Sequence, residues 1–378
     1  MSWLIAALVL LPVWAYLAVV VVAAAAFARR RAVAPATRPP VTVLKPLHGA
    51  EPGLRENLLS FVDQDYPALQ VVFGVRNPAD EAVPTVQTVI RSRPGRDLAL
   101  VVDPRAGGSN LKVANLENML PTARYDILVM ADADMRVEPG YLAAVTAPLH
   151  APGIGLVTCL YKGVPTGGFW SELGALHINY GFLPSALVGE VLGAGGGCFG
   201  ATIALRRDVL DRIGGFASLR DELADDHRAG DAVRELGLKT VLSPYLVENR
   251  VTEPSFAGLW RHELRWARTV RAMAPLGFAG SAITHSVAIA ALVMIVSRFS
   301  AAACWLVLVA CGLRWATALA AGRLLGLPIR RLWLLPLRDA LSFAVFVGSF
   351  CGRSVQWRGQ LFRVEPNGRM SADGDTLG

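Results

Sequence analysis

Hydrophobic positions form two kinds of pattern along this chain. Long, nearly continuous apolar runs occupy both ends, whereas short β-branched runs alternate with polar stretches from Val41 to about Tyr245. Runs of the second kind are typical of buried strands bounded by turns. The predicted strands are VTVLKPL, LQVVFGV, LALVVD, DILVMAD, GLVTCLY, ATIALRR and KTVLSP.

Between the first four predicted strands, the apolar spacing becomes that of a helix. LRENLLSFVDQ carries Leu54, Leu58 and Phe61 at helical intervals, and KVANLENML carries Val113 and Leu116. Strands that alternate with helices predict an α/β domain with a mostly parallel sheet and helices on both faces. In sheets of this kind, ligands bind at the carboxyl ends of the strands.

The apolar run near the N-terminus, WLIAALVLLPVWAYLAVVVVAAAAFA, is long enough to cross a bilayer, which takes about 20 apolar residues. Three arginines, residues 29–31, follow it. A signal peptide would carry its charge before the apolar run, so we interpret residues 1–28 as an uncleaved transmembrane anchor. The basic flank places the next domain, 41–275, in the cytoplasm, after the short proline-rich linker AVAPATRPP.

The C-terminal region 280–352 contains further membrane segments: SAITHSVAIAALVMIVS, AAACWLVLVACGLRWATALAA and LWLLPLRDALSFAVFVGSF. Arginines lie on both sides of the last run, and both flanks cannot be cytoplasmic if that run spans fully. The run also carries Arg338 and Asp339, so we interpret it as re-entrant or interfacial. The last residues, 366–378, predict a disordered tail.

The composition indicates a membrane protein with an attached globular domain, and the several apolar segments make it multi-pass. Of the 378 residues, 53% are hydrophobic and only 18% are charged, and the mean hydropathy is +0.42. The net charge of +7 follows the arginines beside the apolar runs, so we expect a lipid bilayer and no nucleic acid as a partner. The five cysteines are scattered without a C-x-x-C pair, which argues against a disulfide framework or a zinc site.

Two carboxylates, Asp132 and Asp134, stand directly after the predicted strand DILVMAD, in the stretch MADADMRV. In an extended turn, alternate side chains point the same way. Both carboxylates can then meet one divalent cation, Mg²⁺ or Mn²⁺, which commonly bridges to diphosphate oxygens. A polar turn at a strand end would have the same spacing, so the D-x-D spacing alone does not decide between these interpretations.

A second acidic pair, Asp225 and Asp226, precedes a predicted helix in ELADDHRAGDAV. One aspartate at such a position is expected to cap the helix and to interact with its dipole. Capping explains one member of the pair better than two adjacent ones. The other can face a cleft and act as a general base.

Basic residues with an aromatic neighbour follow in RHELRWARTVR, where Arg265 is adjacent to Trp266. This pattern suits a clamp for a diphosphate. It also suits a basic amphipathic helix on a membrane surface, and one helix can do both. In GGSNLKVANLENML, Lys112 lies where a loop enters a helix, so it either holds a phosphate or is an ordinary solvated lysine.

These motifs resemble, in their order along the chain, those of the family 2/21 glycosyltransferases. That order runs through RNPADEA, ADADMRV, LADDHRAG and HELRW. The match is closest to the ceramide glucosyltransferase-like branch, on LKPLHG, DQDYP, SNLKVANL and GGF…LADD. The resemblance covers roughly Val41 to Pro275 and implies a GT-A fold, which is Rossmann-like. The chain as a whole most resembles bacterial members associated with hopanoid lipids, notably over LADDHRAGDAVRELGLKTVLSPYLVE.

The resemblance implies a role for each of four aspartates. Asp80 in RNPADEA matches the aspartate that contacts the nucleotide. Asp132 and Asp134 match the motif that binds the metal and the sugar nucleotide, and the full D-x-D here strengthens the expectation of a divalent cation. Asp226 matches the catalytic base.

The resemblance also extends to the segment before the C-terminal apolar region. HELRW matches the family's (Q/R)-x-x-R-W motif, with Arg265 and Trp266 in place to bind the UDP-sugar. His262 stands where the family has Gln or Arg, and the resemblance assigns it to the same UDP-sugar-binding set. With the first of the two interpretations given above, Lys112 is expected to complete the UDP-sugar-binding site.

The resemblance implies an inverting glycosyltransferase of the bacterial inner membrane, with its catalytic domain in the cytoplasm. The expected reaction moves N-acetylglucosamine from its UDP donor to a hydroxyl of the lipid bacteriohopanetetrol. Ceramide glucosylation with UDP-glucose is an alternative that no single residue excludes. A processive polysaccharide synthase would usually need more spanning helices, and a non-catalytic membrane scaffold would not need the intact acidic and R-W motifs.

Overall fold

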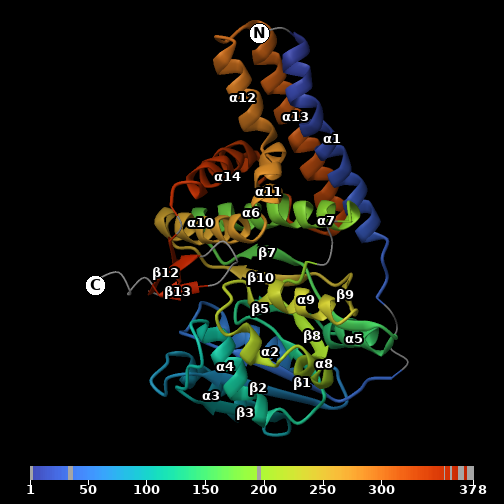
Figure 1. The fold of residues 1–378 in the computed structure, drawn as a ribbon, viewed down its shortest axis with the longest axis vertical. Coiled ribbons are helices and arrows are strands. Elements are labelled where there is room, and N and C mark those ends of the chain that lie inside the picture. Colours follow the sequence, from blue (N-terminus) through green and yellow to red (C-terminus); the bar gives the residue numbers. More distant parts are fainter. Residues whose placement is uncertain are drawn as a thin grey trace.

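The structure is a computed structural model that describes residues 3–32, 37–193, 197–352, 354–357, 360–364 and 370–372. Along its longest axis it has three tiers, as Figure 1 shows. An α/β domain forms the base, a layer of helices lies across it, and a bundle of long helices rises away from that layer.

The base contains a seven-stranded sheet in the order β3-β2-β1-β4-β8-β6-β9. Every neighbouring pair is parallel except those that involve β8, which runs antiparallel to both β4 and β6. The mostly parallel sheet predicted from the sequence is therefore confirmed. Its strands are β1 (Val41–Pro46), β2 (Leu69–Val75), β3 (Asp97–Val102), β4 (Ile127–Met130), β6 (Ile154–Thr158), β8 (Ile203–Arg206) and β9 (Lys239–Leu242).

Helices cover both faces of this sheet, because alternate residues of a strand point to opposite sides. On β1, Val43 packs in one cluster with Leu58 of α2, whereas its neighbour Leu44 packs in another with Val113 of α4. Both faces are buried, which explains the continuous apolar runs. The helices are α2 (Leu54–Val62), α3 (Ala82–Ser92), α4 (Leu111–Met119), α5 (Tyr141–Thr146), α8 (Arg207–Arg212) and α9 (Asp225–Glu235).

A second, smaller sheet, which the sequence pattern did not predict, lies beside the first. It has the order β5-β10-β7, built from β5 (Met135–Arg136), β10 (Val247–Val251) and β7 (Tyr161–Pro165). The pattern missed it because β10 reads VENRV, which is apolar only at its two ends, and β5 has only two residues. This sheet begins directly after the D-x-D segment, with β5, and lies next to the helical layer (Figure 1).

The middle layer consists of α6 (Phe169–His177), α7 (Leu183–Val191) and α10 (Phe256–Met273). A π-helical turn, Ile178–Phe182, joins α6 to α7. In the bundle above, α1 (Trp3–Ala28) packs beside α12 (Ser286–Val296) and α13 (Ala301–Leu325). The remaining helices, α11 (Pro275–Gly280) and α14 (Leu335–Ser349), lie where the bundle meets the layer.

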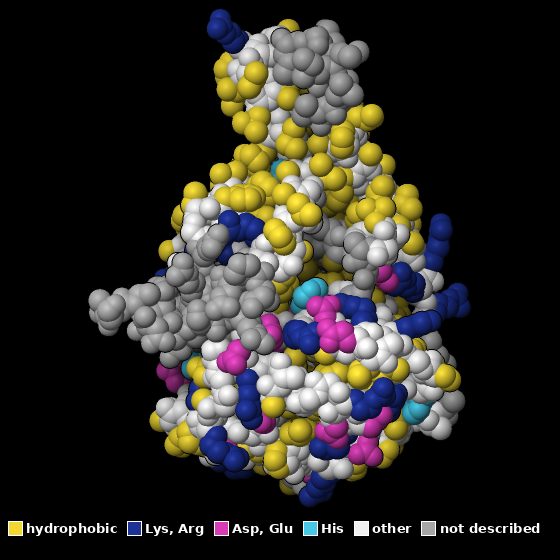
Figure 2. Space-filling model, in the orientation of Figure 1, with side chains coloured by type: hydrophobic (Ala, Val, Ile, Leu, Met, Phe, Trp, Pro, Cys, Tyr) yellow, Lys and Arg dark blue, Asp and Glu magenta, His cyan; other side chains and the backbone are white. Residues whose placement is uncertain are grey.

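The bundle has the surface expected of membrane helices. Among the residues that the structure describes, three helical segments are long and apolar enough to cross a membrane: Leu10–Ala28, Ala301–Leu325 and Leu332–Ser349. The fourth predicted segment is broken, because Pro275–Thr284 and Ser286–Val296 meet at an angle of 73°. Figure 2 shows hydrophobic side chains gathered over the visible face of the bundle, while most charged side chains on that face lie over the α/β domain.

The two charges of the last apolar segment are both paired. Arg338 Nη1 and Nη2 donate to the Glu263 carboxylate of α10 at 2.7 Å each, and Asp339 accepts from Arg314 of α13 at 2.9 Å. Two ion pairs therefore fasten α14 to α10 and to α13. Beside α10 at the foot of the bundle, α14 lies across the direction of α1 and α13 (Figure 1).

Beyond α14 the chain forms a small antiparallel sheet of β11 (Ser354–Trp357), β12 (Gln360–Val364) and β13 (Met370–Ala372). The prediction of a disordered tail at 366–378 is wrong for Met370–Ala372, which pair with β12. Backbone pairing supplies the order that the polar composition does not suggest. The rest of the predicted tail lies outside the described residues.

Candidate active site

One large cavity opens where the carboxyl ends of β1 and β4 face the helical layer. It contains about 2870 Å³ of space between atoms, part of it open to solvent. Pro46 at the end of β1 and Asp132, Asp134 and Met135 after β4 line its base. The strand-end location predicted for the ligand site thus coincides with this cavity.

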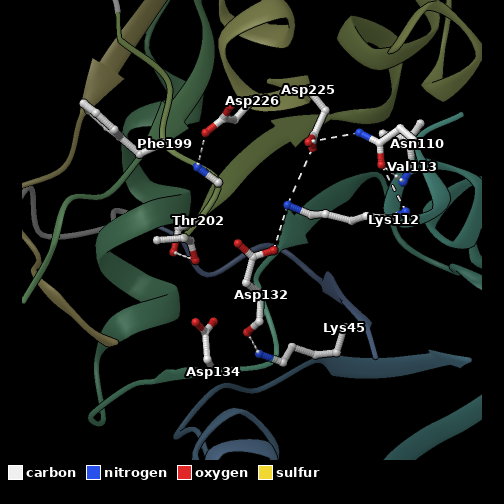
Figure 3. Close-up of polar contacts among 12 residues, drawn as sticks. Lys45, Asn110, Lys112, Val113, Asp132, Asp134, Phe199, Thr202, Asp225 and Asp226 are labelled. Carbon is white, nitrogen blue, oxygen red and sulfur yellow. Dashed lines mark hydrogen bonds and ion pairs between the residues drawn. The ribbon is translucent and has the colours of Figure 1, made fainter. Parts of the chain in front are cut away.

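The Lys112 ammonium group connects the two acidic motifs across this cavity. Its Nζ lies 2.7 Å from Asp132 Oδ1 and 3.6 Å from Asp225 Oδ2 (Figure 3). Burial disfavours the charged ammonium, but the Asp132 and Asp225 carboxylates outweigh burial and raise the pKa of Lys112. Lys112 therefore stays charged. It enters α4 just after the cap residue Asn110, whose side chain accepts from the amides of Lys112 and Val113.

Asp134 lies in a neighbourhood with a surplus of negative charge. Its Oδ2 accepts a hydrogen bond from Asn249 of β10 at 2.7 Å. Burial, followed by the carboxylates of Glu51 and Asp132, raises the pKa of Asp134 to about 7. A cation that bound here would relieve this repulsion, and both aspartates of the D-x-D line the same cavity. The residues thus fit a divalent ion.

Such an ion would not be enclosed by protein groups alone. Among the described side chains, no group of three or more His, Cys, Asp or Glu residues converges to hold a metal. Mg²⁺ and Mn²⁺ commonly bind through one or two carboxylates together with substrate phosphates. Asp132 and Asp134 match that partial ligand set, with the remaining positions left to a diphosphate and water.

Asp226 is oriented by two backbone amides at the start of α9. Gly200 N donates to its Oδ2 and His227 N to its Oδ1, each at 2.8 Å (Figure 3 shows the first). Burial and the adjacent Asp225 carboxylate raise the pKa of Asp226 to about 6. It is thus a fixed carboxylate at the cavity wall whose pKa lies close to neutrality, as a general base requires.

Neither acidic residue of this pair is the N-cap of α9, which is Ala224. The expectation that one of them caps the helix is therefore wrong. Asp225 instead accepts from Asn110 Nδ2 at 3.3 Å and pairs with Lys112. Both carboxylates lie in the first helical turn, where the helix dipole still favours negative charge.

The HELRW segment forms the opposite wall of the cavity on α10. His262, Arg265 and Trp266 all line it. The His262 ring contacts Trp266 edge to face at 4.4 Å, and its Nδ1 lies 2.6 Å from Glu253 Oε1. The third polar residue of the segment, Glu263, also borders the cavity but is neutralised by its pair with Arg338.

Asp80 does not reach the cavity wall in the described structure. Its Oδ1 accepts hydrogen bonds from Gly49 N and Ala82 N, both at 2.9 Å. Its Oδ2 lies 3.4 Å from Nδ1 of His48, which does line the cavity. In this arrangement, Asp80 holds the loop after β1 in place, and a direct contact to a nucleotide stays a prediction.

Comparison with known proteins gives the family of the chain. The model of glycosyl transferase family 21 matches residues 5–370. The chain belongs to glycosyl transferase family 21. This confirms the predicted enzyme class, a glycosyltransferase, and the predicted kinship with ceramide glucosyltransferases.

Among curated family 21 relatives, ceramide glucosyltransferase 1 of Caenorhabditis elegans is 25% identical over 240 residues, which are 63% of this chain and 51% of the relative. Ceramide glucosyltransferase of Komagataella phaffii is 31% identical over 107 residues, 27% of this chain and 21% of that protein. The chain spans about half the length, or less, of the curated relatives it matches.

A solved structure supports the fold of this family 21 chain. The mannosyltransferase PcManGT from Pyrobaculum calidifontis, solved with GDP-Man and Mn²⁺, is 22% identical and superimposes with a TM-score of 0.54. The superposition covers 91% of this chain and 98% of PcManGT. The predicted GT-A fold is confirmed.

The structure also identifies site residues that the sequence analysis missed. Lys45 of β1 is fully buried beneath the D-x-D, where its Nζ donates to the Asp132 carbonyl and lies 3.9 Å from the centre of the Phe61 ring. Burial lowers the pKa of Lys45 to about 7, although Asp132 and Asp134 oppose that shift. The charged residue in VTVLKPL, an otherwise apolar strand, was the signal for it.

Gly200 is the other site residue that the sequence analysis did not identify. A Cβ atom built on it would lie 3.3 Å from Asp226 Oδ2 and 3.4 Å from both Asp132 Oδ2 and Lys112 Nζ. Gly200 is therefore the point at which the D-x-D, the lysine and the predicted base converge. The sequence analysis identified its segment only as a glycine-rich wall, and 194–196 of that wall lie outside the described residues.

Proposed function

We propose that this chain is a membrane glycosyltransferase that moves a sugar from a UDP-sugar to a hydroxyl of a lipid. The observation that carries the proposal is the continuity of the cavity. A single cavity is lined by the acidic residues Asp132 and Asp226 and, at its other end, by Tyr16 of α1 and Arg314 of α13. A lipid in the bilayer can thus present a hydroxyl to the acidic site without leaving the membrane.

Asp226 accepts the proton of the acceptor hydroxyl as that oxygen attacks the anomeric carbon. The bond from the anomeric carbon to the UDP oxygen breaks as the new glycosidic bond forms, so the anomeric configuration inverts. The amides of Gly200 and His227 hold the Asp226 carboxylate in one orientation, which favours in-line attack.

The charge that develops on the departing UDP needs positive partners. Lys112 and Arg265 border the cavity and supply them. Asp132 and Asp134 are the residues that would hold a divalent cation, Mg²⁺ or Mn²⁺. Such an ion supplies Lewis-acid neutralisation of the diphosphate.

Within this class, we propose UDP-N-acetylglucosamine as donor and a hopanoid such as bacteriohopanetetrol as acceptor, at the cytoplasmic face of a bacterial inner membrane. This finer proposal rests on the resemblance of segment 223–248 to hopanoid-associated bacterial enzymes. A second candidate is glucosylation of ceramide from UDP-glucose, which the ceramide glucosyltransferases among its relatives favour.

The test is to incubate membranes containing the protein with each UDP-sugar and each lipid in turn, followed by lipid mass spectrometry. We expect one sugar to be added to the hopanoid from UDP-N-acetylglucosamine. Glucosylceramide as the sole product would support the second candidate instead. If no lipid of a total extract gains a sugar and no UDP is released, the proposed function is wrong.

A further inference from the structure

The cavity extends well beyond the acidic site, into the space between the membrane helices. Its far end is bordered by polar side chains on apolar helices: Tyr16 of α1, His285 before α12, Arg314 and Thr317 of α13, and Asp339 and Ser342 of α14. We refer to these six residues as the bundle cluster. Polar groups among membrane helices are costly, and they usually mark a functional site.

Arg314 is the central residue of the bundle cluster and is only 9% exposed. Its Nε and Nη2 donate to the two Asp339 oxygens at 2.9 and 3.0 Å, and Nη2 also donates to the Tyr180 carbonyl at 2.9 Å. Its third nitrogen, Nη1, makes no hydrogen bond to any residue that the structure describes. Because Arg314 borders the cavity, that nitrogen is available to a ligand.

The neighbouring buried arginine, Arg338, shows what a purely structural pair looks like in this protein. All three of its nitrogens are satisfied, two by Glu263 and the third by Ser342 Oγ at 3.1 Å. It is 1% exposed and does not border the cavity. Arg314, on the preceding helix, has one nitrogen without a hydrogen bond to the described residues, is more exposed at 9%, and borders the cavity.

Two further observations indicate a ligand at the bundle cluster. Thr317, one turn beyond Arg314, is 8% exposed and borders the cavity, and its hydroxyl makes no hydrogen bond to the described residues. The Tyr180 carbonyl that accepts from Arg314 belongs to the π-helical turn, and Tyr180 itself lines the cavity. Single π turns within helices are frequent at functional sites.

We propose that the bundle cluster is a second polar subsite of the acceptor, which binds hydroxyl groups of a polyol headgroup other than the one that receives the sugar. The inference rests on the proposed function and deepens it. Arg314 Nη1 donates to a headgroup oxygen, while the Thr317 hydroxyl and the Asp339 carboxylate can accept from headgroup hydroxyls. A lipid with one hydroxyl would leave these largely buried groups without a headgroup partner, so the site selects against it.

The experiment uses the full chain in nanodiscs and two lipids with the same alkyl chain, the hexadecyl ether of erythritol and hexadecan-1-ol. Equilibrium binding is measured without donor, and transfer is measured with the UDP-sugar. We expect the wild type to prefer the polyol ether by at least about tenfold in both measurements, the discrimination typical of one buried hydrogen bond. Equal binding of both lipids by the wild type would overturn the subsite.

The principal variant is Thr317→Val, which removes a hydroxyl with almost no change in volume. We expect it to reduce the preference for the polyol ether several-fold without changing the KM for the UDP-sugar. Arg314→Lys, which keeps the charge opposite Asp339 but loses the planar fork, should reduce it further. Leu308→Ala, on an outward position of the same helix that is 61% exposed, is the control and should leave the preference unchanged.

A loss of activity that is equal for both lipids in Thr317→Val would mean that the cluster only holds the helices together, and it would overturn the inference. The proposed function fails separately, if neither lipid receives sugar while both are bound. Because the binding measurement needs no donor, the subsite is tested in either case.

Discussion

Lys112 Nζ lies 2.7 Å from Asp132 Oδ1 and 3.6 Å from Asp225 Oδ2, so a single ammonium group neutralises part of two motifs that are far apart in the sequence. The Lys112 side chain is mostly buried, with 15% of its surface exposed. Removal of the ammonium would leave the Asp132 and Asp225 carboxylates facing each other across the cavity. The predicted donor site therefore depends on a residue that belongs to neither motif.

The first prediction concerns this lysine. Lys112→Met should lower kcat/KM for the UDP-sugar by about 10²-fold, the typical loss when one electrostatic partner of a developing charge is removed. Lys112→Arg should retain part of the activity because it keeps the charge. Steady-state kinetics at saturating lipid measure both effects, and wild-type kinetics in Lys112→Met would exclude a role in the donor site. Lys239→Met, at an exposed residue of β9, is the matched control.

The second prediction concerns the base. Asp226→Asn should reduce transfer by roughly 10³-fold, within the range for loss of general-base catalysis, while UDP affinity stays within about threefold of wild type. Calorimetric titration of UDP into wild type and variant checks the second part. Full activity in Asp226→Asn would reject the assignment.

The pH dependence of the wild type follows from the same carboxylate. A general base is active only when deprotonated, and burial and Asp225 raise the pKa of Asp226 to about 6. The transfer rate should therefore be constant above that pH and fall about tenfold per pH unit below it. A pH–rate profile at saturating donor measures the midpoint, and a midpoint near the ordinary value of an aspartate, about 4, would contradict this role.

The third prediction concerns the divalent cation. Removal of divalent ions with EDTA should abolish transfer, and Mn²⁺ or Mg²⁺ should restore it. Asp134→Asn should weaken Mn²⁺ binding at least about tenfold when UDP is present, since it removes one of the two carboxylates proposed to hold the ion. Electron paramagnetic resonance of bound Mn²⁺ measures this without any activity assay. Undiminished binding in the variant would remove Asp134 from the ligand set.

The fourth prediction concerns Gly200, whose added Cβ would lie 3.3 to 3.4 Å from Asp226, Asp132 and Lys112. Gly200→Ala should lower kcat about tenfold, because small displacements of a catalytic group have large effects on rate. The thermal stability of the Gly200→Ala variant should change little, since the added methyl group borders a cavity. Gly189→Ala on α7, where a Cβ meets nothing within 4 Å, is the matched control and should leave kcat unchanged.

The fifth prediction concerns the ion pair that fastens α14 to α10. Arg338→Met leaves the Glu263 carboxylate buried without a partner and should destabilise the protein by about 3 to 5 kcal/mol. The double variant Arg338→Met/Glu263→Leu should recover most of that loss, because both charges are gone. Thermal unfolding in one detergent compares them, with the exposed Arg323→Met as control. A double variant no more stable than the single one would show that the pair does not act as a unit.

Much of the fold could be predicted from local pattern. The β-branched runs predicted the seven strands of the main sheet, because a strand buried on both faces needs continuous apolar residues. The helical spacing of apolar residues predicted α2 and α4. The small sheet was missed because β10 is polar at its three central positions and β5 is very short. Pairing with β7 and β5 stabilises these strands, and that pairing is a long-range property.

In the candidate site, too, some residues could be located from the sequence and others could not. Asp132, Asp134 and Asp226 could be located from the sequence, because strand ends and helix starts of a parallel sheet meet at one edge. The position of Asp80 away from the cavity wall and the partners of Lys45 could not, since each depends on which backbone amides or aromatic rings pack against the side chain.

By itself, the sequence determined the order of the elements, the apolar segments at both ends and the presence of the acidic and HELRW motifs, since hydrophobic period and residue type are local properties. Only the tertiary structure decided that Lys112 joins Asp132 to Asp225, and that Arg314 meets Asp339 at the wall of the same cavity. The physical reason is that the strength of a charge and its partners depend on burial and on contacts between distant segments. Neither of these properties is contained in a local pattern.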